Sequence, residues 1–318
     1  MFGSSSTCGL VHLDVTSPVR SRLKIAAIDY LNPAPLMWDF EHGAKQEQLA
    51  ERYAIHATLP AQCAVELAAG RADIGLIPAT AYATTPDLVV IPGCAIASLD
   101  AVRSILLVVR SGRALSQVRR VAMDPSSRSS NLYAQIVLRK FFQAEPEFVQ
   151  RNKQPSHHAT TAIDLCALLQ DCDAAVLIGD PALRLHVSGV REIPETGEPI
   201  QCMDLAQVWH AHTGLPWVSA FWAVRPDAIE AAGQTPDQIR ADFLHSRDAG
   251  LGHIEEIVAE WAPRFADAPA VAAQEIDFYL SDNIHYILDA ACMEGLECFY
   301  RYAAEMRLLP RVESLRFL

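Results

Sequence analysis

"LKIAAIDYLNPAPLMWDF", residues 23–40, combines a strand and a helix in immediate succession. Residues 23–30 form an apolar run of strand length, and the prolines that follow suit the first turn of a helix. Residues 53–59 and 72–79 are apolar in the same way, and residues 60–70 between them form an amphipathic segment that ends at a glycine. This β-α-β-α-β order predicts a parallel sheet with crossover helices.

The alternation of strands and helices breaks at residues 111–117, "SGRALSQ", and then restarts. A second set of alternating elements runs to about residue 190, and the chain from Thr235 onward is predicted to be nearly all helical. Two α/β units joined by two crossings of the chain describe a two-lobed clamshell. We predict a disordered lead over residues 1–22, lobe I over residues 23–110 and 217–318, and lobe II over residues 111–216, with crossings near Arg110 and Pro216.

The composition limits the classes of partner. The chain has 318 residues, 51% of them hydrophobic, and a net charge of −12, so nucleic acid and anionic membrane surfaces are unsuitable partners. No apolar stretch reaches the roughly 18 residues of a membrane helix, and no run of about 7–15 apolar residues precedes Cys8, as export would require. The eight cysteines contain no CxxC pair. We therefore expect a cytoplasmic protein with reduced thiols and no metal site.

Hydroxyl groups gather at the start of one predicted helix, in "DPSSRSS", residues 124–130. A helix N-terminus presents free backbone N–H groups and the positive end of the helix dipole, which together bind anions. Ordinary capping needs one hydroxyl, from Ser129 or Ser130, whereas Ser127 and Arg128 add further donors. We therefore favour a site for a small anion over a simple cap.

Three further positions follow predicted strands or lie within one, where ligands bind in open α/β sheets. Tyr30 and Asn32 follow the first strand, and Asn32 either caps the next helix or hydrogen-bonds a ligand oxygen. Gly179 would allow a ligand to approach the backbone, and Asp180 is either another helix cap or a catalytic carboxylate. Ser104 lies in an apolar strand and is either a core serine or a cleft residue. These residues alone indicate a two-lobed binder of a small anion.

The same residues carry a resemblance. The stretches "IDYLNPAPL", "VRSILLVV", "SSRSSNLY", "AAVLIGDPAL" and "DLAQVWHAHTGLPWVSAFWAVR" resemble, in order, the chorismate dehydratase family of the futalosine route to menaquinone. The resemblance runs from about residue 23 to beyond residue 300. It implies the type II periplasmic-binding-protein fold, with a helical C-terminal segment, and a hydro-lyase that converts chorismate to 3-[(1-carboxyvinyl)oxy]benzoate and water.

The resemblance also implies roles for individual residues. Asn32 and Ser104 are implied to touch the substrate, and the turn Ser127–Ser130 matches the family's Ser-Arg-Thr-Ser turn with one Thr replaced by Ser. A carboxylate of chorismate is then the candidate anion. Asp100 stands where the family tends to have glycine, and it would disfavour an anion if it pointed inward.

The implied reaction needs no redox cofactor and no metal, because its product is aromatic. It does need a proton acceptor, and no motif residue is an obvious one. We predict that the substrate's enolpyruvyl carboxylate takes the proton and that Asp180 is structural, with Asp180 as the alternative base. Two other readings stay open, namely a small-anion solute-binding protein of the same fold and the sister dihydroxynaphthoate synthase. The sequence does not give the oligomeric state.

Overall fold

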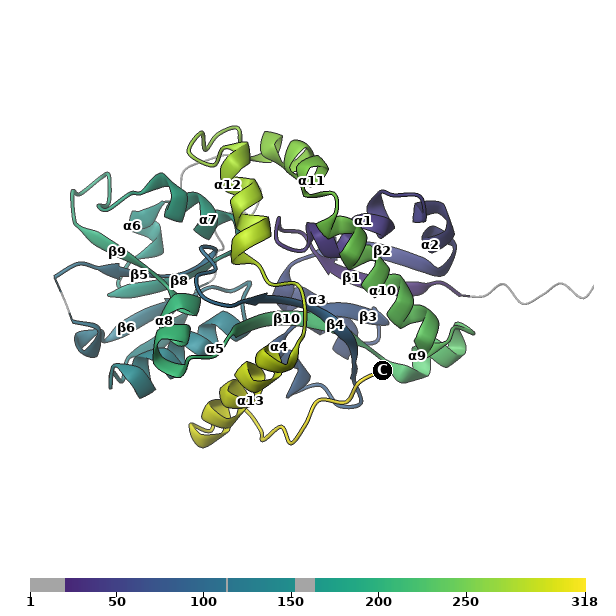
Figure 1. Ribbon diagram of the computed structural model, residues 1–318. Coiled ribbons are helices and arrows are strands. Elements are labelled where there is room, and N and C mark those ends of the chain that lie inside the picture. The colour runs from purple at the N-terminus through teal and green to yellow at the C-terminus, as the bar shows by residue number, and fades with distance from the viewer. Residues whose placement is uncertain (1–20, 113, 152–163) are drawn as a thin grey trace, which may run out of the picture.

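The computed structural model describes residues 21–112, 114–151 and 164–318 of the chain. These residues form two five-stranded sheets, each flanked by helices, which lie at opposite ends of the molecule (Figure 1). The two-lobed α/β architecture predicted from the sequence is therefore confirmed. All but the last two residues of the predicted lead, residues 1–22, lie outside the described part of the chain.

The first sheet has the strand order β2-β1-β3-β10-β4. Its first three strands are parallel, as predicted, whereas β10 runs antiparallel to both of its neighbours. β1 is almost entirely buried, which explains its unbroken apolar run. The strands are β1 (Leu23–Ile28), β2 (Tyr53–Thr58), β3 (Ile74–Pro78), β4 (Val89–Ser98) and β10 (Trp217–Val224), and the helices among them are α1 (Ala34–Glu41), α2 (Gln46–Arg52), α3 (Pro60–Ala68) and α4 (Ala79–Tyr82).

The second sheet has the order β7-β6-β8-β5-β9, again with three parallel strands, and β5 runs antiparallel to β8 and β9. Both sheets are thus mixed rather than parallel, because one strand of each, β10 in the first and β5 in the second, runs against the others. The strands are β5 (Ile105–Arg110), β6 (Arg120–Met123), β7 (Glu147–Gln150), β8 (Ala174–Ile178) and β9 (Ile200–Asp204), and the helices are α5 (Ser129–Ile136), α6 (Leu165–Leu168), α7 (Gly179–Ser188) and α8 (Leu205–Thr213).

The chain first passes between the sheets earlier than the sequence predicts. β5 pairs with β8 and β9, so the crossing lies between Ser98 and Ile105 and not near Arg110. The predicted lobe boundary at residue 110 is therefore wrong by one strand. Residues 99–104, between β4 and β5, contain no Gly or Pro that would mark a linker, so the pattern alone does not show that the chain changes sheet there.

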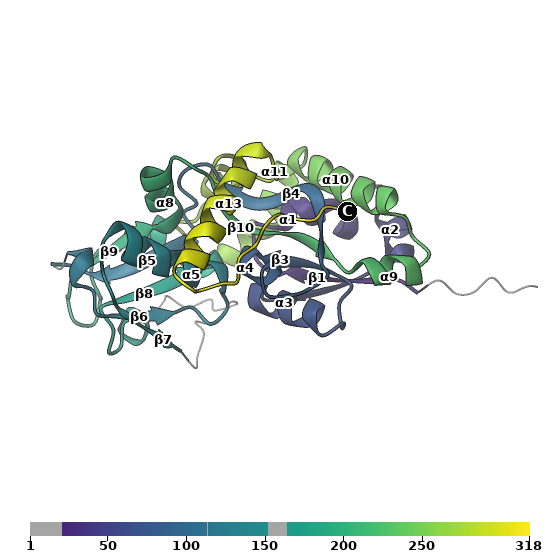
Figure 2. The same cartoon turned by 90° about the horizontal axis from the view of Figure 1, so that it is seen from below.

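The C-terminal part is helical, as predicted, as far as Glu305. α10 packs on α1, and α13 packs on both β10 and α5, so the C-terminal helices contact both units; Figure 2 shows α13 beside α5. The last residues run extended beside β4, where the backbone N–H of Leu318 donates to Val90. The elements are α9 (Pro226–Ala231), α10 (Pro236–Leu251), α11 (Ile254–Trp261), α12 (Ala273–Phe278), a π-helical turn (Tyr279–Asn283) and α13 (Ala290–Glu305).

An aromatic stack joins the two units beneath α5. The Tyr133 ring stacks on Trp217 of β10, with 3.7 Å between ring centroids, and on Phe299 of α13, at 4.0 Å. All three side chains are fully buried. Because large buried rings dominate core energetics, this stack fixes the position of α5 and hence of the serines at its start. None of the described helices combines the length and hydropathy needed to cross a membrane.

Candidate active site

A narrow cavity of about 50 Å³ lies between the two sheets, where β1, β3 and β8 end. Most of the site residues predicted from the sequence line it, although they come from distant parts of the chain. Hollows of about 550 and 710 Å³ elsewhere on the molecule contain none of them. The cavity is lined by Ile28, Tyr30, Asn32, Pro60, Pro78, Ile96, Ser104, Ile105, Ser127, Ser129, Ser130, Ile178, Gly179, Ser219 and Ala220.

The serine turn forms one wall of this cavity. α5 begins at Ser129 and its N-cap residue is Arg128, but the hydroxyl that serves the first turn is that of Ser127, whose Oγ accepts the backbone N–H of Ser130 at 3.1 Å. Ser129 Oγ accepts the backbone N–H of Thr80, also at 3.1 Å, and thereby joins the second unit to the first. The predicted cap at Ser129 or Ser130 is therefore wrong by a few residues. Ser129 Oγ also lies 3.3 Å from Thr80 Oγ1, where either hydroxyl can donate. When Thr80 donates, both serine hydroxyls keep their own protons for a ligand.

Asp124 and Asn131 hold the serine turn in shape. The Asp124 carboxylate accepts the backbone N–H groups of Ser126, at 2.9 Å, and Ile178, at 3.1 Å. Asn131 Oδ1 accepts the backbone N–H of Asp124, and its amide donates back to the Asp124 carbonyl. Burial raises the pKa of Asp124, and these hydrogen bonds counteract that effect. Neither residue is among the sites predicted from the sequence, although an Asp ahead of a Ser-rich turn is a recognisable signal.

The opposite wall carries Tyr30 and Asn32, with Asp180 behind it. An Asp180 carboxylate oxygen accepts the backbone N–H of Leu31 at 3.1 Å, so it fixes the backbone beside Asn32. Asp180 does not line the cavity. Its burial raises its pKa from 3.8 to about 6, with the Leu31 hydrogen bond and Arg184 acting in the other direction. The interpretation of Asp180 as the N-cap of its own helix is wrong, because the N-cap of α7 is Ile178 and the Asp180 carboxylate instead reaches across to the first unit.

Ser104 is a cleft residue and not a plain core serine. It is buried, lines the cavity immediately before β5, and its Oγ lies 2.8 Å from the hydroxyl of Tyr279. Tyr279 belongs to the π-helical turn of the C-terminal part. The sequence does not predict Tyr279 as a site residue, because no local pattern links it to a residue so distant in the chain.

A contact within the protein explains why position 179 is a glycine. Its backbone has φ +70°, and a Cβ atom there would lie 2.8 Å from the ring of Tyr30. Glycine is therefore required by close contact with a protein ring as well as by its left-handed conformation. Gly179 also lines the cavity, so close approach of a ligand to its backbone stays a prediction.

Two charged residues lie away from the cavity. Arg128 is exposed and does not line it, so the serine turn presents its hydroxyls and amides without this guanidinium. Asp100 is exposed as well, and it therefore does not place a negative charge in the cavity. The lining contains no Lys, Arg, His, Asp or Glu side chain. Its chemistry is thus that of neutral hydroxyls, one amide and a helix N-terminus.

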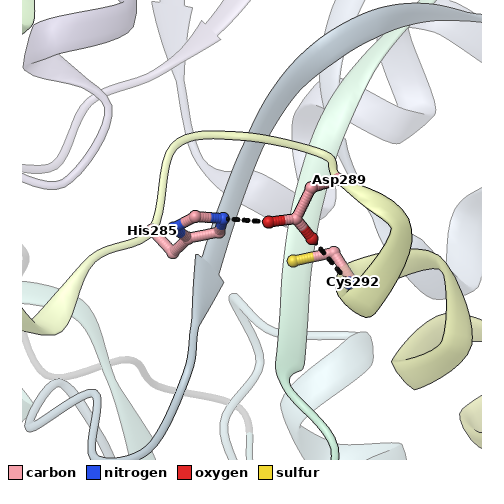
Figure 3. A group of neighbouring side chains, drawn as sticks. All are labelled: His285, Asp289 and Cys292. Atoms are coloured by element: carbon pink, nitrogen blue, oxygen red, sulfur yellow. Dashed lines mark hydrogen bonds and ion pairs between the residues drawn. The ribbon is translucent and has the colours of Figure 1, made fainter.

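His285, Asp289 and Cys292 lie together at the start of α13, away from the cavity (Figure 3). The Asp289 carboxylate caps α13 through the backbone N–H of Cys292, at 2.9 Å, and pairs with His285 Nε2, at 2.8 Å. Burial, together with the Asp289 charge, raises the pKa of the Cys292 thiol to about 12. Both carboxylate oxygens of Asp289 are thus used within this group, one by His285 and one by the N–H of Cys292. We interpret this group as a helix cap.

Comparison with known proteins agrees with this architecture. The chain is 27% identical, over 279 residues, to a chorismate dehydratase of Thermus thermophilus, a match that covers 85% of this chain and 91% of that protein. Among solved structures, the alkanesulfonate-binding protein SsuA of Xanthomonas axonopodis pv. citri, bound to MOPS, has a TM-score of 0.60 at 16% identity and covers 91% of this chain and 94% of its own. The periplasmic aliphatic sulphonate binding protein SsuA of Escherichia coli has a TM-score of 0.56 at 18% identity and covers 92% and 95%.

At these identities the two binding proteins show the fold alone, and they confirm the predicted periplasmic-binding-protein-like clamshell. The sequence profile of one family, described as menaquinone biosynthesis, matches residues 23–305, which is most of the chain. This chain therefore belongs to the menaquinone biosynthesis family.

Proposed function

We propose that the protein is a chorismate dehydratase. The observation that carries the proposal is the cavity between the sheets, whose neutral hydroxyls and helix N-terminus come from the same motifs that resemble that family. The Thermus thermophilus relative supports it. The cytoplasmic location expected from the sequence stays a prediction.

The proposed reaction eliminates water from chorismate. The C3–H bond breaks and its proton passes to a base, the electron pair forms a ring double bond, and the C4 hydroxyl leaves and is protonated to water. The product, 3-[(1-carboxyvinyl)oxy]benzoate, is aromatic. Negative charge that develops at C3 spreads towards the ring carboxylate, so groups that bind this carboxylate stabilise the transition state.

The cavity wall that comes from the second sheet and carries the serine turn is suited to binding this carboxylate. Ser127, Ser129 and Ser130 are buried, and their hydroxyl protons and the first N–H groups of α5 are suited to a carboxylate. Preorganised donors of this kind need no cationic side chain, and exposed Arg128 is not required. We assign these three serines to binding of a chorismate carboxylate.

The proton acceptor is the substrate itself in this proposal. No side chain that lines the cavity is a carboxylate, an imidazole or an amine, which supports transfer of the C3 proton to the enolpyruvyl carboxylate. Asn32 and Ser104 would hold the conformer in which that carboxylate reaches C3. Asp180 acts behind Asn32, through the backbone of Leu31.

The size of the cavity supports a closed state of the two units. Its volume of about 50 Å³ is below that of a substrate site, for which roughly 300 Å³ is a lower bound, so substrate must enter while the units are further apart. Contacts across the cleft, such as that of Ser129 Oγ with the Thr80 N–H, then form on closure and exclude water.

One assay tests the proposal. Purified protein is incubated with chorismate, and the product is followed by ultraviolet absorbance and identified by mass spectrometry. Formation of the benzoate confirms the activity. Binding of chorismate without turnover would favour the solute-binding alternative, and absence of both would leave the sister dihydroxynaphthoate synthase as the reading to assay next.

A further inference from the structure

Tyr279 lies beneath the cavity, between the residues that we assign to catalysis. It is 1% exposed, and the π-helical turn that it begins, Tyr279–Asn283, directly follows α12. π-helical turns are rare and often occur at functional sites. The C-terminal part of the chain, which supplies no residue to the cavity lining, thus places one phenol directly behind it.

The phenol connects one residue from each unit. The Tyr279 hydroxyl donates to Ser104 Oγ, just before β5, at 2.8 Å. The side chain of Asn32, which follows β1, also interacts with this hydroxyl and lowers the pKa of Tyr279. Burial raises the pKa of Tyr279, and the hydrogen bonds with Ser104 and Asn32 lower it by a smaller amount. The phenol therefore keeps its proton at neutral pH.

The number of protons fixes the direction of these bonds. A phenol has one proton, so when it donates to Ser104 Oγ it can only accept from Asn32, and that bond must come from an amide N–H. Asn32 then keeps its carbonyl oxygen for other partners, and Asn32 lines the cavity. Ser104 already has a donor, so its own proton is available to a ligand.

The same helical segment fixes the loop that carries Ser104. Asn283 Nδ2 donates to the carbonyl of Ala101 at 3.2 Å, and Glu275 of α12 pairs with Arg103 at 2.6 Å. The loop that leads to Ser104 and the phenol that contacts Ser104 are therefore held by one element. Movement of this segment would displace both together.

We propose that Tyr279 is a positioning residue that orients the Asn32 amide and the Ser104 hydroxyl for elimination from chorismate. This inference rests on the proposed function. Tyr279 lies outside the cavity lining, so it acts on the substrate only by orienting its two partners, Asn32 and Ser104.

Tyr286 provides a matched control. It is a second tyrosine of the C-terminal part, it is 3% exposed, and its hydroxyl has no hydrogen-bond partner within the described ranges. Removal of either hydroxyl deletes one oxygen atom from a buried ring. The two variants therefore differ chiefly in whether that oxygen holds Ser104 and Asn32.

The test compares Tyr279→Phe and Tyr286→Phe in full-length protein by steady-state kinetics with chorismate, after circular dichroism and melting have confirmed the fold. Misplacement of a reacting group can cost about 10²-fold in rate, so we expect kcat of Tyr279→Phe to fall about 10- to 100-fold with KM changed less than about threefold. Tyr286→Phe should stay within about twofold of wild type in both. Ser104→Ala removes the same bond from its other end, so Tyr279→Phe should cost less in that background than in wild type, and the cost that remains measures the contact with Asn32.

Equal kcat for the two tyrosine variants would overturn the positioning role, and so would an effect of Tyr279→Phe as large on the Ser104→Ala background as on wild type. A variant of Tyr279 too unstable to assay leaves Ser104→Ala as the test, and unchanged kcat there would overturn the role as well. If the wild-type protein does not turn over chorismate, the proposed function itself is overturned. If the wild type is active but the two tyrosine variants cannot be distinguished, only the positioning role of Tyr279 is overturned.

Discussion

The wall of the cavity that comes from the second sheet carries four serines, the start of a helix and two isoleucines, whereas the wall from the first sheet carries two prolines, two isoleucines, one phenol, one amide and a single serine, Ser219. The first kind of wall stabilises negative charge, and the second kind restricts shape and orientation. The difference suggests a division of labour, in which the serine turn of the second unit binds the substrate carboxylate and the first unit, together with Ser104, selects the reactive conformer. Substitutions on the two walls should therefore affect different kinetic constants.

Asn32→Ala tests the first-sheet wall and should have the largest effect. Removal of the amide leaves the serine turn intact, so binding of the carboxylate should persist, but the reactive conformer is no longer held. We expect kcat to fall by roughly 10²-fold or more with a small change in KM, measured by steady-state kinetics with chorismate. A rise in KM at constant kcat would show that Asn32 only binds, and it would remove the division between the walls.

Ser129→Ala and Ser130→Ala test the second-sheet wall. Each loses a hydrogen bond to a charged group, which is worth about 1.5–3 kcal/mol, so KM should rise about 10- to 100-fold. Ser129→Ala should have the larger effect, because Ser129 Oγ also accepts the Thr80 N–H across the cleft. Arg128→Ala is the control within the same turn, since Arg128 is exposed and should leave KM nearly unchanged. Unchanged kinetics in the double serine variant would contradict the assignment.

The sequence predicts one wall better than the other, for a physical reason. Hydroxyls that gather at a helix start are a local signal, so Ser127, Ser129 and Ser130 could be named from their spacing. The contact of Tyr279 with Asn32 and Ser104 depends on how the C-terminal helices pack, and no periodicity within one segment encodes it. Prediction from sequence is limited in the same way for β5, because its residue pattern identifies a strand but does not show which of the two sheets that strand joins.

Gly179 lies where the two walls touch, and Gly179→Ala tests that contact through stability. The new Cβ would meet the Tyr30 ring at 2.8 Å in a backbone with φ +70°. Gly189→Ala is a matched control, with φ +65° and nothing within 4 Å of the place that a Cβ would take. Both variants incur left-handed strain, of about 1–2 kcal/mol, and only Gly179→Ala adds the clash. Denaturant unfolding should therefore show the greater loss for Gly179→Ala, and equal losses would contradict the tight contact with Tyr30.

Asp180 lies outside the cavity and links the two walls through its hydrogen bond with the Leu31 N–H. Among the substitutions of predicted catalytic residues, Asp180→Asn should reduce turnover least. The asparagine carbonyl can still accept the Leu31 N–H, so Asn32 stays in place and kcat should remain within about tenfold of wild type. A loss of about 10⁴-fold or more in a folded variant would instead identify Asp180 as the base.

The pH dependence of the free energy of unfolding reports the protonation of Asp180 independently of turnover. Burial raises the Asp180 pKa from 3.8 to about 6, so between these values the folded state holds a proton that the unfolded state has lost. The contribution of Asp180 is thus fully present below about pH 4, falls as pH rises towards 6, and is absent in Asp180→Asn. Urea unfolding at pH 4.5 and 7.5 should show that wild type loses stability relative to the variant as pH rises, by less than about 3 kcal/mol. A relative gain with rising pH would mean that the folded state favours the charged form, and Asp180 would then be an ion-pair partner across the cleft and not a buried acid that positions Leu31.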